Sequence, residues 1–239
     1  IVKAQWKSAF INDGISMKKI AIIVAGGQGV RMNSKLPKQF MLLKGKPVIY
    51  YSIKTFLDAY DDLDIVLVLP EEYQAIGREM VNAYFNTARI EITAGGATRF
   101  QSVKNGLKLV NENAIIFVHD GVRCLVSKKL IHRCYHDAVQ HGSAIPVIPS
   151  KDSVRLLIQD GSQSVDRSKL MLVQTPQTFQ SNILQPAYQI AYQESFTDEA
   201  SVVESHGGKL FLTEGEELNM KITKPIDLLI AEKILESKQ

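Results

Sequence analysis

The chain of 239 residues carries 28 Lys and Arg against 25 Asp and Glu, and 45% of its residues are hydrophobic, which suffices for one large domain with a sizeable core. Its net charge of +3, without a block of basic residues interleaved with aromatics, argues against nucleic-acid binding but suits an anionic small substrate. No apolar run approaches the roughly 20 residues that span a bilayer, and the two cysteines form no CxxC pair, so we expect a cytoplasmic protein without a membrane span, disulfide framework or zinc knuckle.

Residues 1–16 lack the order of a signal peptide and end before Met17-Lys18-Lys19, so we treat them as a leader outside the fold and expect one domain over 17–239. From there, short β-rich runs alternate with amphipathic stretches. The predicted strands are Lys19–Ala25, Ile65–Leu69, Ile90–Thr93, Ile115–His119, Ala144–Ile148, Met171–Gln174 and Leu210–Thr213. The predicted helices span about 47–58, 71–85, 99–111, 128–140, 180–193, 198–206 and 224–236.

This alternation predicts an α/β fold, a Rossmann-like, mainly parallel mixed sheet with helices on both faces. In such sheets ligands bind beyond the carboxyl ends of the strands. The loops that follow the predicted strands are therefore where functional residues are expected.

A glycine-rich loop follows the first predicted strand and ends in Pro37-Lys38-Gln39. It lacks the Gly-Lys-Ser/Thr of a P-loop, and a methionine stands where a dinucleotide-binding loop needs its third glycine. Its glycines let the backbone approach a ligand, and Arg31 and Lys38 add positive charge. The arrangement favours binding of a triphosphate.

Two histidines, His132 and His136, stand four residues apart on a predicted helix. The residue after the first is Arg133, where a zinc protease needs glutamate, and no third ligand is evident nearby. We expect a solvated or packed helix face rather than a metal site.

The segment 150–169 interrupts the alternation, because two short β-type stretches flank Asp160-Gly161, a strong hairpin signal. An isolated hairpin is only marginally stable in water, so this one should pack on something. The pattern leaves open whether that is a second subunit or the hairpin's own domain.

The run Gly-Gly-x-Gly-x-Arg-Met followed by Pro-Lys-Gln resembles the signature loop of nucleotidyltransferases that activate sugar and polyol phosphates. From about Lys18 onward the chain resembles most closely the cytidylyltransferase family that acts on 2-C-methyl-D-erythritol 4-phosphate in the non-mevalonate isoprenoid pathway. The blocks that carry the resemblance after the loop are Gly95–Val103, Val118–Arg123, Asp152-Ser153, Val165–Arg167, Gln174–Gln177, Thr197–Ser201 and Asn219–Thr223. Cys124 departs from the proline that the family usually has.

The resemblance implies that CMP moves from CTP to the phosphate of a small polyol phosphate, with release of pyrophosphate. It implies that Arg31, Lys38 and Lys221 are catalytic and stabilise the transition state. The implied CTP-binding residues are Ala25, Gly26, Gly27, Gly29, Gly95, Gly96, Arg99, Ser102 and Asp120. Mg²⁺ is the implied cofactor, with Asp120 near it, directly or indirectly.

The resemblance also implies a homodimer in which the hairpin is a dimerisation arm. Its implied acceptor-binding residues are Arg123, Ser153, Arg167, Thr175, Thr197 and Asp198, with Ser153 and Arg167 reaching the partner's site. Structural explanations stay open for some of them. Asp198-Glu199 could simply start a helix with Thr197 as N-cap, and Asp120 could pair with Arg123 in a loop salt bridge.

Three rival functions remain. A ribitol 5-phosphate cytidylyltransferase would share the loop and the arm, although the run Val165–Leu170 leading into Gln174–Gln177 is more similar to the isoprenoid family. A uridylyl- or adenylyltransferase is disfavoured by the Gly95–Ser102 turn. A non-catalytic nucleotide-binding dimer would not need Arg31, Lys38 and Lys221 together, and pyrophosphate release from CTP would separate it from an enzyme.

Overall fold

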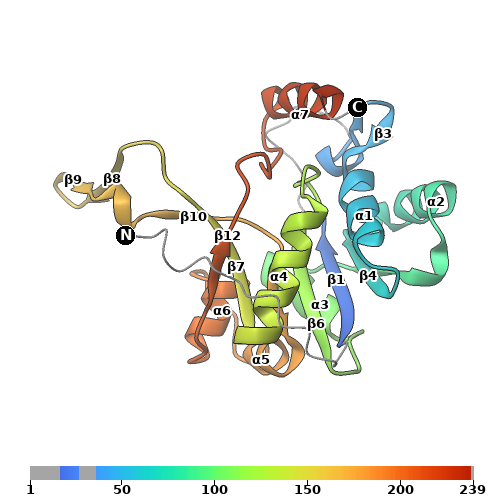
Figure 1. Ribbon diagram of the computed structural model, residues 1–239, viewed down its shortest axis with the longest axis horizontal. Helices are drawn as coiled ribbons and strands as arrows, with labels where there is room; N and C mark the ends of the chain where they lie inside the picture. The colour runs from blue at the N-terminus through green and yellow to red at the C-terminus, as the bar shows by residue number, and fades with distance from the viewer. Residues whose placement is uncertain (1–16, 27–35, 238–239) are drawn as a thin grey trace.

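The computed structural model describes residues 17–26 and 36–237, and Figure 1 shows its helices on both sides of a central sheet. The predicted leader and three predicted site residues, Gly27, Gly29 and Arg31, lie outside the described residues. Within the described ranges, no helix is long and apolar enough to cross a membrane.

The central sheet has eight strands. In spatial order they are β10 (Met171–Val173), β7 (Ser143–Pro149), β11 (Gln177–Gln180), β6 (Ala114–Asp120), β1 (Lys18–Val24), β4 (Leu63–Leu69) and β5 (Ile90–Ala94), with β12 (Leu212–Glu214) beside β7. The pairs β1–β6, β1–β4, β4–β5 and β12–β7 are parallel, whereas β11 runs antiparallel to both of its neighbours. The prediction of a mainly parallel mixed sheet is confirmed.

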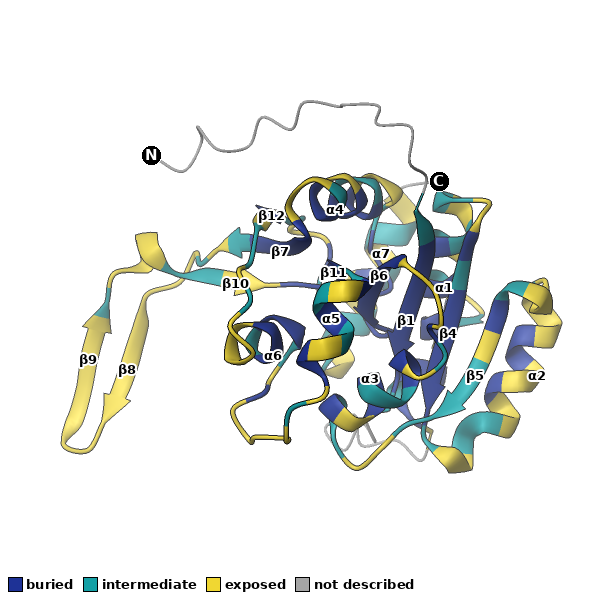
Figure 2. Cartoon of the chain, turned by 90° about the horizontal axis from the view of Figure 1, so that it is seen from below, coloured by how far each residue is buried: buried dark blue, intermediate teal, exposed yellow. Residues whose placement is uncertain are grey.

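Helices cover both faces because the central strands are apolar on both. Along β1, Ala21 and Ile23 belong to one core cluster, while Ile20 and Ile22 belong to the other. The helices over the first face are α1 (Val48–Ala59), α2 (Gln74–Tyr84) and α4 (Lys128–His141). Those over the second are α3 (Arg99–Leu107), α5 (Ser181–Ala187) and α6 (Glu199–Ser205). Buried residues accordingly fill β1, β4 and β6 in Figure 2.

Smaller elements complete the described chain. The last helix, α7 (Pro225–Ser237), packs against the short ribbon of β2 (Leu42–Leu43) and β3 (Lys46–Pro47). Single 3₁₀ turns occupy Lys38–Phe40, Glu71–Tyr73, Thr87–Arg89 and Arg167–Lys169. The ribbon was not among the predicted elements, because its two-residue strands are too short to show an alternating pattern.

Two sequence predictions differ from the structure. The strand β11 was missed because three of its four residues are polar, and it is buried only because amides such as Gln177 and Gln180 find hydrogen-bond partners inside the protein. The helix predicted over 180–193 ends at Ala187, shortly after Pro186. Beyond it the chain continues in turns that stack Phe196 on Phe100.

The predicted hairpin is present as β8 (Val154–Ile158) and β9 (Gly161–Val165), and Gly161 adopts the positive φ of +112° that its turn requires. It projects from the body instead of folding back over its own domain (Figures 1 and 2). Every residue of β8 is exposed, and Leu157 retains 84% of its accessible surface. Exposure of apolar side chains on this scale marks an interaction surface.

Candidate active site

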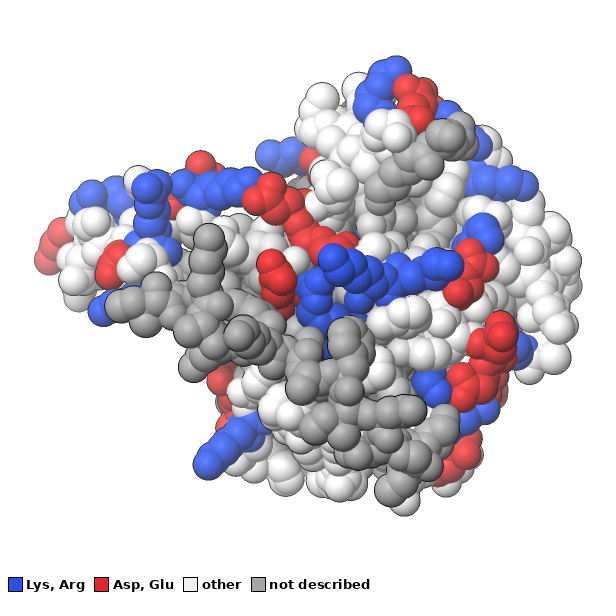
Figure 3. Space-filling view, in the orientation of Figure 1, with Lys and Arg blue, Asp and Glu red and all other residues white. Residues whose placement is uncertain are grey.

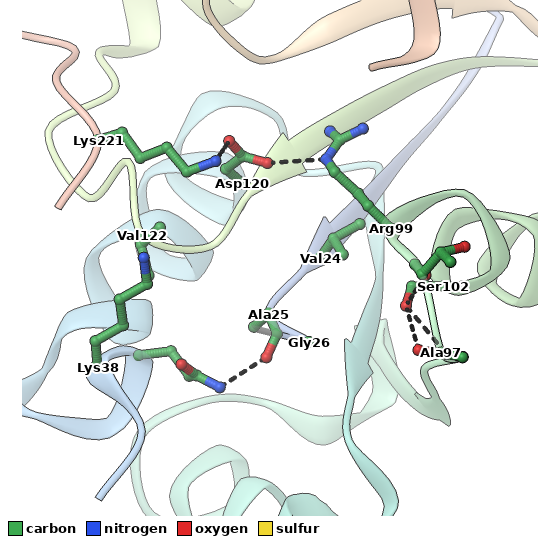
Figure 4. Close-up of a pocket in the computed structure, with 13 residues that line it drawn as sticks. Val24, Ala25, Gly26, Lys38, Ala97, Arg99, Ser102, Asp120, Val122 and Lys221 are labelled. Carbon is green, nitrogen blue, oxygen red and sulfur yellow. Dashed lines mark hydrogen bonds and ion pairs between the residues drawn. The ribbon is translucent and has the colours of Figure 1, made fainter. Parts of the chain in front are cut away.

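A pocket of about 350 Å³ lies beyond the carboxyl ends of β1 and β6, the edge of the sheet where ligands of such folds bind. This volume falls within the range of small-molecule sites. Its lining residues are Val24, Ala25, Gly26, Lys38, Gln39, Gly96, Ala97, Thr98, Arg99, Ser102, Asp120, Val122 and Lys221 (Figure 4). The pocket thus brings together eight of the predicted site residues from five separate segments of the chain.

One wall of the pocket is a turn that leads from β5 into α3. The Ser102 hydroxyl accepts a hydrogen bond from the Gly96 N–H at 3.0 Å and donates to the Thr98 carbonyl, also at 3.0 Å. A Cβ atom on Gly95 would lie only 3.0 Å from that hydroxyl. The Ser102 side chain therefore holds this turn together through its hydrogen bonds, and the lack of a side chain at Gly95 lets the backbone lie close to the Ser102 hydroxyl.

The opposite wall carries Lys38 and Gln39. The Lys38 ammonium donates to the Ile222 carbonyl at 3.0 Å, and the Gln39 amide donates to the Ala25 carbonyl at 2.7 Å. These contacts join the end of the glycine loop to β1 and to the segment that carries Lys221. The sequence analysis had not singled out Gln39, whose side chain ties the 3₁₀ turn to the pocket.

Asp120, the last residue of β6, lies among three cations. Its Oδ1 is 3.3 Å from Arg99 Nε, and its Oδ2 is 2.8 Å from Lys221 Nζ (Figure 4). Oδ2 also lies 3.7 Å from Arg123 Nε. Burial would raise the pKa of this carboxyl, but Arg99, Lys221 and Arg123 together hold the pKa well below its usual range. Asp120 is therefore an ionised group that divides its two oxygens between different cations, and the salt bridge to Arg123 is present.

Arg99 is in turn held by a buried carboxylate. Its two terminal nitrogens donate to both oxygens of Glu199, which is 0% exposed and also accepts a hydrogen bond from the Tyr188 hydroxyl at 3.1 Å. Burial alone would lower the pKa of Arg99, but Glu199 and Asp120 raise it. Sequence reasoning missed this role of Glu199, because only the fold brings it to Arg99.

Glu199 is the first residue of α6, in agreement with the prediction that Asp198-Glu199 could start a helix. The helix N-cap is Asp198, which accepts from the Ser201 N–H in a capping box, so the suggestion that Thr197 is the N-cap is wrong. The second carboxylate oxygen of Asp198 accepts from the Gln177 side chain at 2.9 Å. Thr197 is exposed beside it.

The other four predicted acceptor residues fall into two groups. Arg123 and Thr175 lie directly behind Asp120, and the Thr175 hydroxyl accepts a hydrogen bond from the Asp120 N–H at 3.0 Å. Ser153 and Arg167 lie at the base of the projecting hairpin, where they are exposed and do not line the pocket. Within one chain the structure does not bring these two to the pocket.

A neutral histidine completes this end of the site. His119 is fully buried, which lowers its pKa to about 3 despite the opposing effect of Asp120. Its ring nitrogens contact the Thr175 hydroxyl at 3.1 Å and the Arg123 carbonyl at 3.3 Å. Its place in the Val118–Arg123 block was the only sequence signal for it.

The described residues contain no group of three or more His, Cys, Asp or Glu side chains that could hold a metal on their own. Asp120 nevertheless fits the way in which Mg²⁺ is often bound, through one or two carboxylates together with substrate phosphates. His132 contacts the Ala59 carbonyl at 3.0 Å, so this side chain is packed against the end of α1.

The family model for 2-C-methyl-D-erythritol 4-phosphate cytidylyltransferase (IspD) matches residues 19–237. The chain belongs to this family. A family member from Bacteroides fragilis is 45% identical over 219 residues, which cover 92% of this chain and 100% of the relative.

Solved structures of the cytidylyltransferase family share the fold. The 4-diphosphocytidyl-2C-methyl-D-erythritol synthase from Anaerococcus prevotii aligns with a TM-score of 0.80 at 26% identity, over 92% of this chain and 96% of that one. The Francisella tularensis 2-C-methyl-D-erythritol 4-phosphate cytidylyltransferase aligns at 0.76 with 28% identity, over 90% and 99%. Membership in the IspD family makes the chain a nucleotidyltransferase of the cytidylyltransferase type.

Proposed function

We propose that this pocket binds CTP and that the protein transfers its CMP moiety to the phosphate of 2-C-methyl-D-erythritol 4-phosphate, releasing pyrophosphate. The observation that carries the proposal is the convergence of Lys38, Arg99 and Lys221, from three distant segments, on one pocket beside Asp120. Family membership supports the same cytidylyl transfer. The reaction belongs to the non-mevalonate route to isoprenoids.

We propose one orientation for CTP in the pocket. The turn formed by Gly95, Gly96 and Ser102 offers close backbone groups to the cytosine edge, at the far side of the pocket from Lys38 (Figure 4). The backbone of Ala25 and Gly26 would receive the triphosphate. Gly27, Gly29 and Arg31 continue that loop and are proposed to complete the triphosphate site.

The chemistry needs positive charge more than a base. The attacking atom is an oxygen of a phosphate monoester, which is largely ionised near neutral pH because its second pKa is about 6. It forms a bond to the α-phosphorus of CTP as the bond to the bridging oxygen of the β-phosphate breaks, and pyrophosphate leaves with that electron pair. Lys38 and Lys221, with Arg31, would stabilise the charge that develops on the α-phosphoryl group.

We propose Mg²⁺ as the cofactor, held by the triphosphate oxygens with Asp120 beside it. When bound, such an ion neutralises phosphate charge and acts as a Lewis acid. Asp120 suits this place because it is ionised and faces the pocket. Its Lys221 partner keeps 40% of its side-chain surface exposed and so has room to turn toward a phosphate.

The acceptor would lie at the Asp120 end, against Arg123, with Thr175, Thr197 and Asp198 bordering it. Ser153 and Arg167 can contribute only if a second chain supplies them, which supports a homodimer formed through the hairpin.

The hairpin's apolar side chains Leu156, Leu157 and Ile158 would be covered in that dimer. On the face seen in Figure 3, basic side chains gather at the centre of the body and along the hairpin, with acidic side chains beside them. Two unpaired, buried cysteines, Cys124 and Cys134, suit a cytoplasmic location.

The test is pyrophosphate release from CTP and Mg²⁺, run in parallel with 2-C-methyl-D-erythritol 4-phosphate and with ribitol 5-phosphate. Release with the first acceptor alone is the expected result. Release with ribitol 5-phosphate alone would keep the mechanism but replace the acceptor. Release with neither, from folded protein that binds CTP, would support the non-catalytic module instead.

A further inference from the structure

A closed ring of hydrogen bonds lies behind the Asp120 end of the pocket. His119 Nε2 is 3.3 Å from the Arg123 carbonyl, and His119 Nδ1 is 3.1 Å from the Thr175 hydroxyl. The Thr175 carbonyl accepts from the Asn219 side chain at 2.8 Å, and the Asn219 carbonyl accepts from the Arg123 guanidinium at 2.8 Å. The ring therefore joins the end of β6, the turn before β11 and the loop after β12.

The chemistry of the partners sets the direction of these bonds. A carbonyl oxygen can only accept, so the proton of His119 must be on Nε2. Burial disfavours a second proton on an imidazole that is 0% exposed, which leaves Nδ1 as an acceptor. The Thr175 hydroxyl must then donate to Nδ1 while it accepts from the Asp120 N–H.

Thr175 has only one hydroxyl proton, and this ring uses it. While the ring is intact, Thr175 has no proton to donate to a phosphate or hydroxyl oxygen of the acceptor. Its contact with the site runs instead through the backbone of Asp120. Asn219 acts in a similar way, because it lies two residues before Lys221 and holds the Arg123 side chain through its own carbonyl.

We propose that His119 and Asn219 are positioning residues, and that the Thr175 hydroxyl fixes Asp120 for the reaction rather than holding the acceptor. This inference rests on the proposed cytidylyl transfer. The ring links the segments that bear Asp120, Arg123 and Lys221. Breaking it therefore shifts the Asp120 carboxylate relative to the cationic side chains of Arg123 and Lys221. A misplacement of about 1 Å can cost about 10²-fold in rate.

Thr175→Val removes the hydroxyl with little change in shape, and Thr175→Ser is its matched control because it restores the hydroxyl. We expect Thr175→Val and His119→Asn each to lower kcat about 10- to 100-fold, with a smaller rise in the KM for the acceptor, because the ring also holds Arg123, which lies against the acceptor. Thr175→Ser should stay close to wild type. The loss in the double variant should be smaller than the two single losses combined, because both changes break the hydrogen bond between Thr175 and His119, while each also removes one of its own.

Other results would overturn the inference. A raised acceptor KM with unchanged kcat in Thr175→Val would show a direct acceptor contact. A lowered melting temperature with normal kcat per folded molecule in His119→Asn would show a role in stability alone.

A spectroscopic measurement separates this inference from the proposed function. The ¹⁵N shifts of His119 in histidine-labelled protein, assigned by their loss in His119→Asn, should show a protonated Nε2 and an unprotonated Nδ1 that responds to Thr175→Val. Another protonation pattern would overturn the ring even in active protein. An inactive wild-type protein with the expected shifts would instead count against the proposed function only.

Discussion

The buried pair of Arg99 and Glu199 allows one perturbation to be worked through. Glu199→Gln keeps the size of the side chain but removes the negative charge of the carboxylate that accepts from both terminal nitrogens of Arg99. Breaking a buried ion pair by removing one partner costs about 3–5 kcal/mol, because the other charge is left uncompensated. Arg99 retains 25% of its side-chain surface and a second anionic contact in Asp120, so we expect a loss near the lower end, about 3 kcal/mol.

The measurement is the free energy of unfolding from urea denaturation. Tyr188→Phe is the matched control, since it removes only the hydroxyl that donates to Glu199 and should cost about 1–2 kcal/mol. The double change Glu199→Met with Arg99→Met removes both charges and should be less destabilising than Glu199→Gln alone. A Glu199→Gln loss below about 1 kcal/mol, or a double variant that is worse than it, would refute the account of a buried, compensated pair.

Three further predictions concern catalysis, assembly and pH. Lys38→Ala should lower kcat about 10²–10³-fold, while the Kd for CTP measured by calorimetry changes far less. The control Lys129→Ala, at an exposed position, should match wild type in both quantities. Unchanged turnover in Lys38→Ala would show that Lys38 is not a catalytic residue. Leu157→Asp should shift the protein from dimer to monomer in analytical ultracentrifugation without loss of melting temperature, because that side chain is exposed in the single chain; a persistent dimer would place the interface elsewhere. The pKa of His119 is about 3 in the folded state, below the unfolded value of about 6.5. The stability that comes from burying this neutral imidazole is therefore complete above pH 6.5 and is lost as the pH falls toward 3, by up to about 1.4 kcal/mol per pH unit. In His119→Asn, the free energy of unfolding should fall less steeply as the pH is lowered.

Much of the architecture could be predicted because it depends on local patterns. The alternation of apolar strands and amphipathic helices is sufficient to indicate a mainly parallel sheet, and Asp160-Gly161 is sufficient to indicate a hairpin. Lys38 could be nominated from the residues alone, because a glycine-rich loop with added positive charge suits phosphate binding. Asp120 and Lys221 could be nominated only because their sequence blocks resemble those of the family.

The strand β11 and the supporting residues of the site could not be predicted in the same way. Gln177 is polar and yet buried, because Asp198 and the Ala200 N–H satisfy its amide. No local pattern anticipates such partners. The antiparallel position of β11 between β6 and β7 therefore follows from packing and hydrogen bonding in the folded chain.

The sequence by itself determined the class of fold, the hairpin and which charged side chains the candidate site could contain, since each depends on residues close together along the chain. Only the tertiary structure decided how those groups are held. Glu199 meets Arg99 across 100 residues, and the Thr175 hydroxyl meets the Asp120 N–H across 55. Buried charges and hydrogen-bonding groups need partners wherever the fold places them, and those partners are set by the meeting of distant strands and loops rather than by sequence spacing.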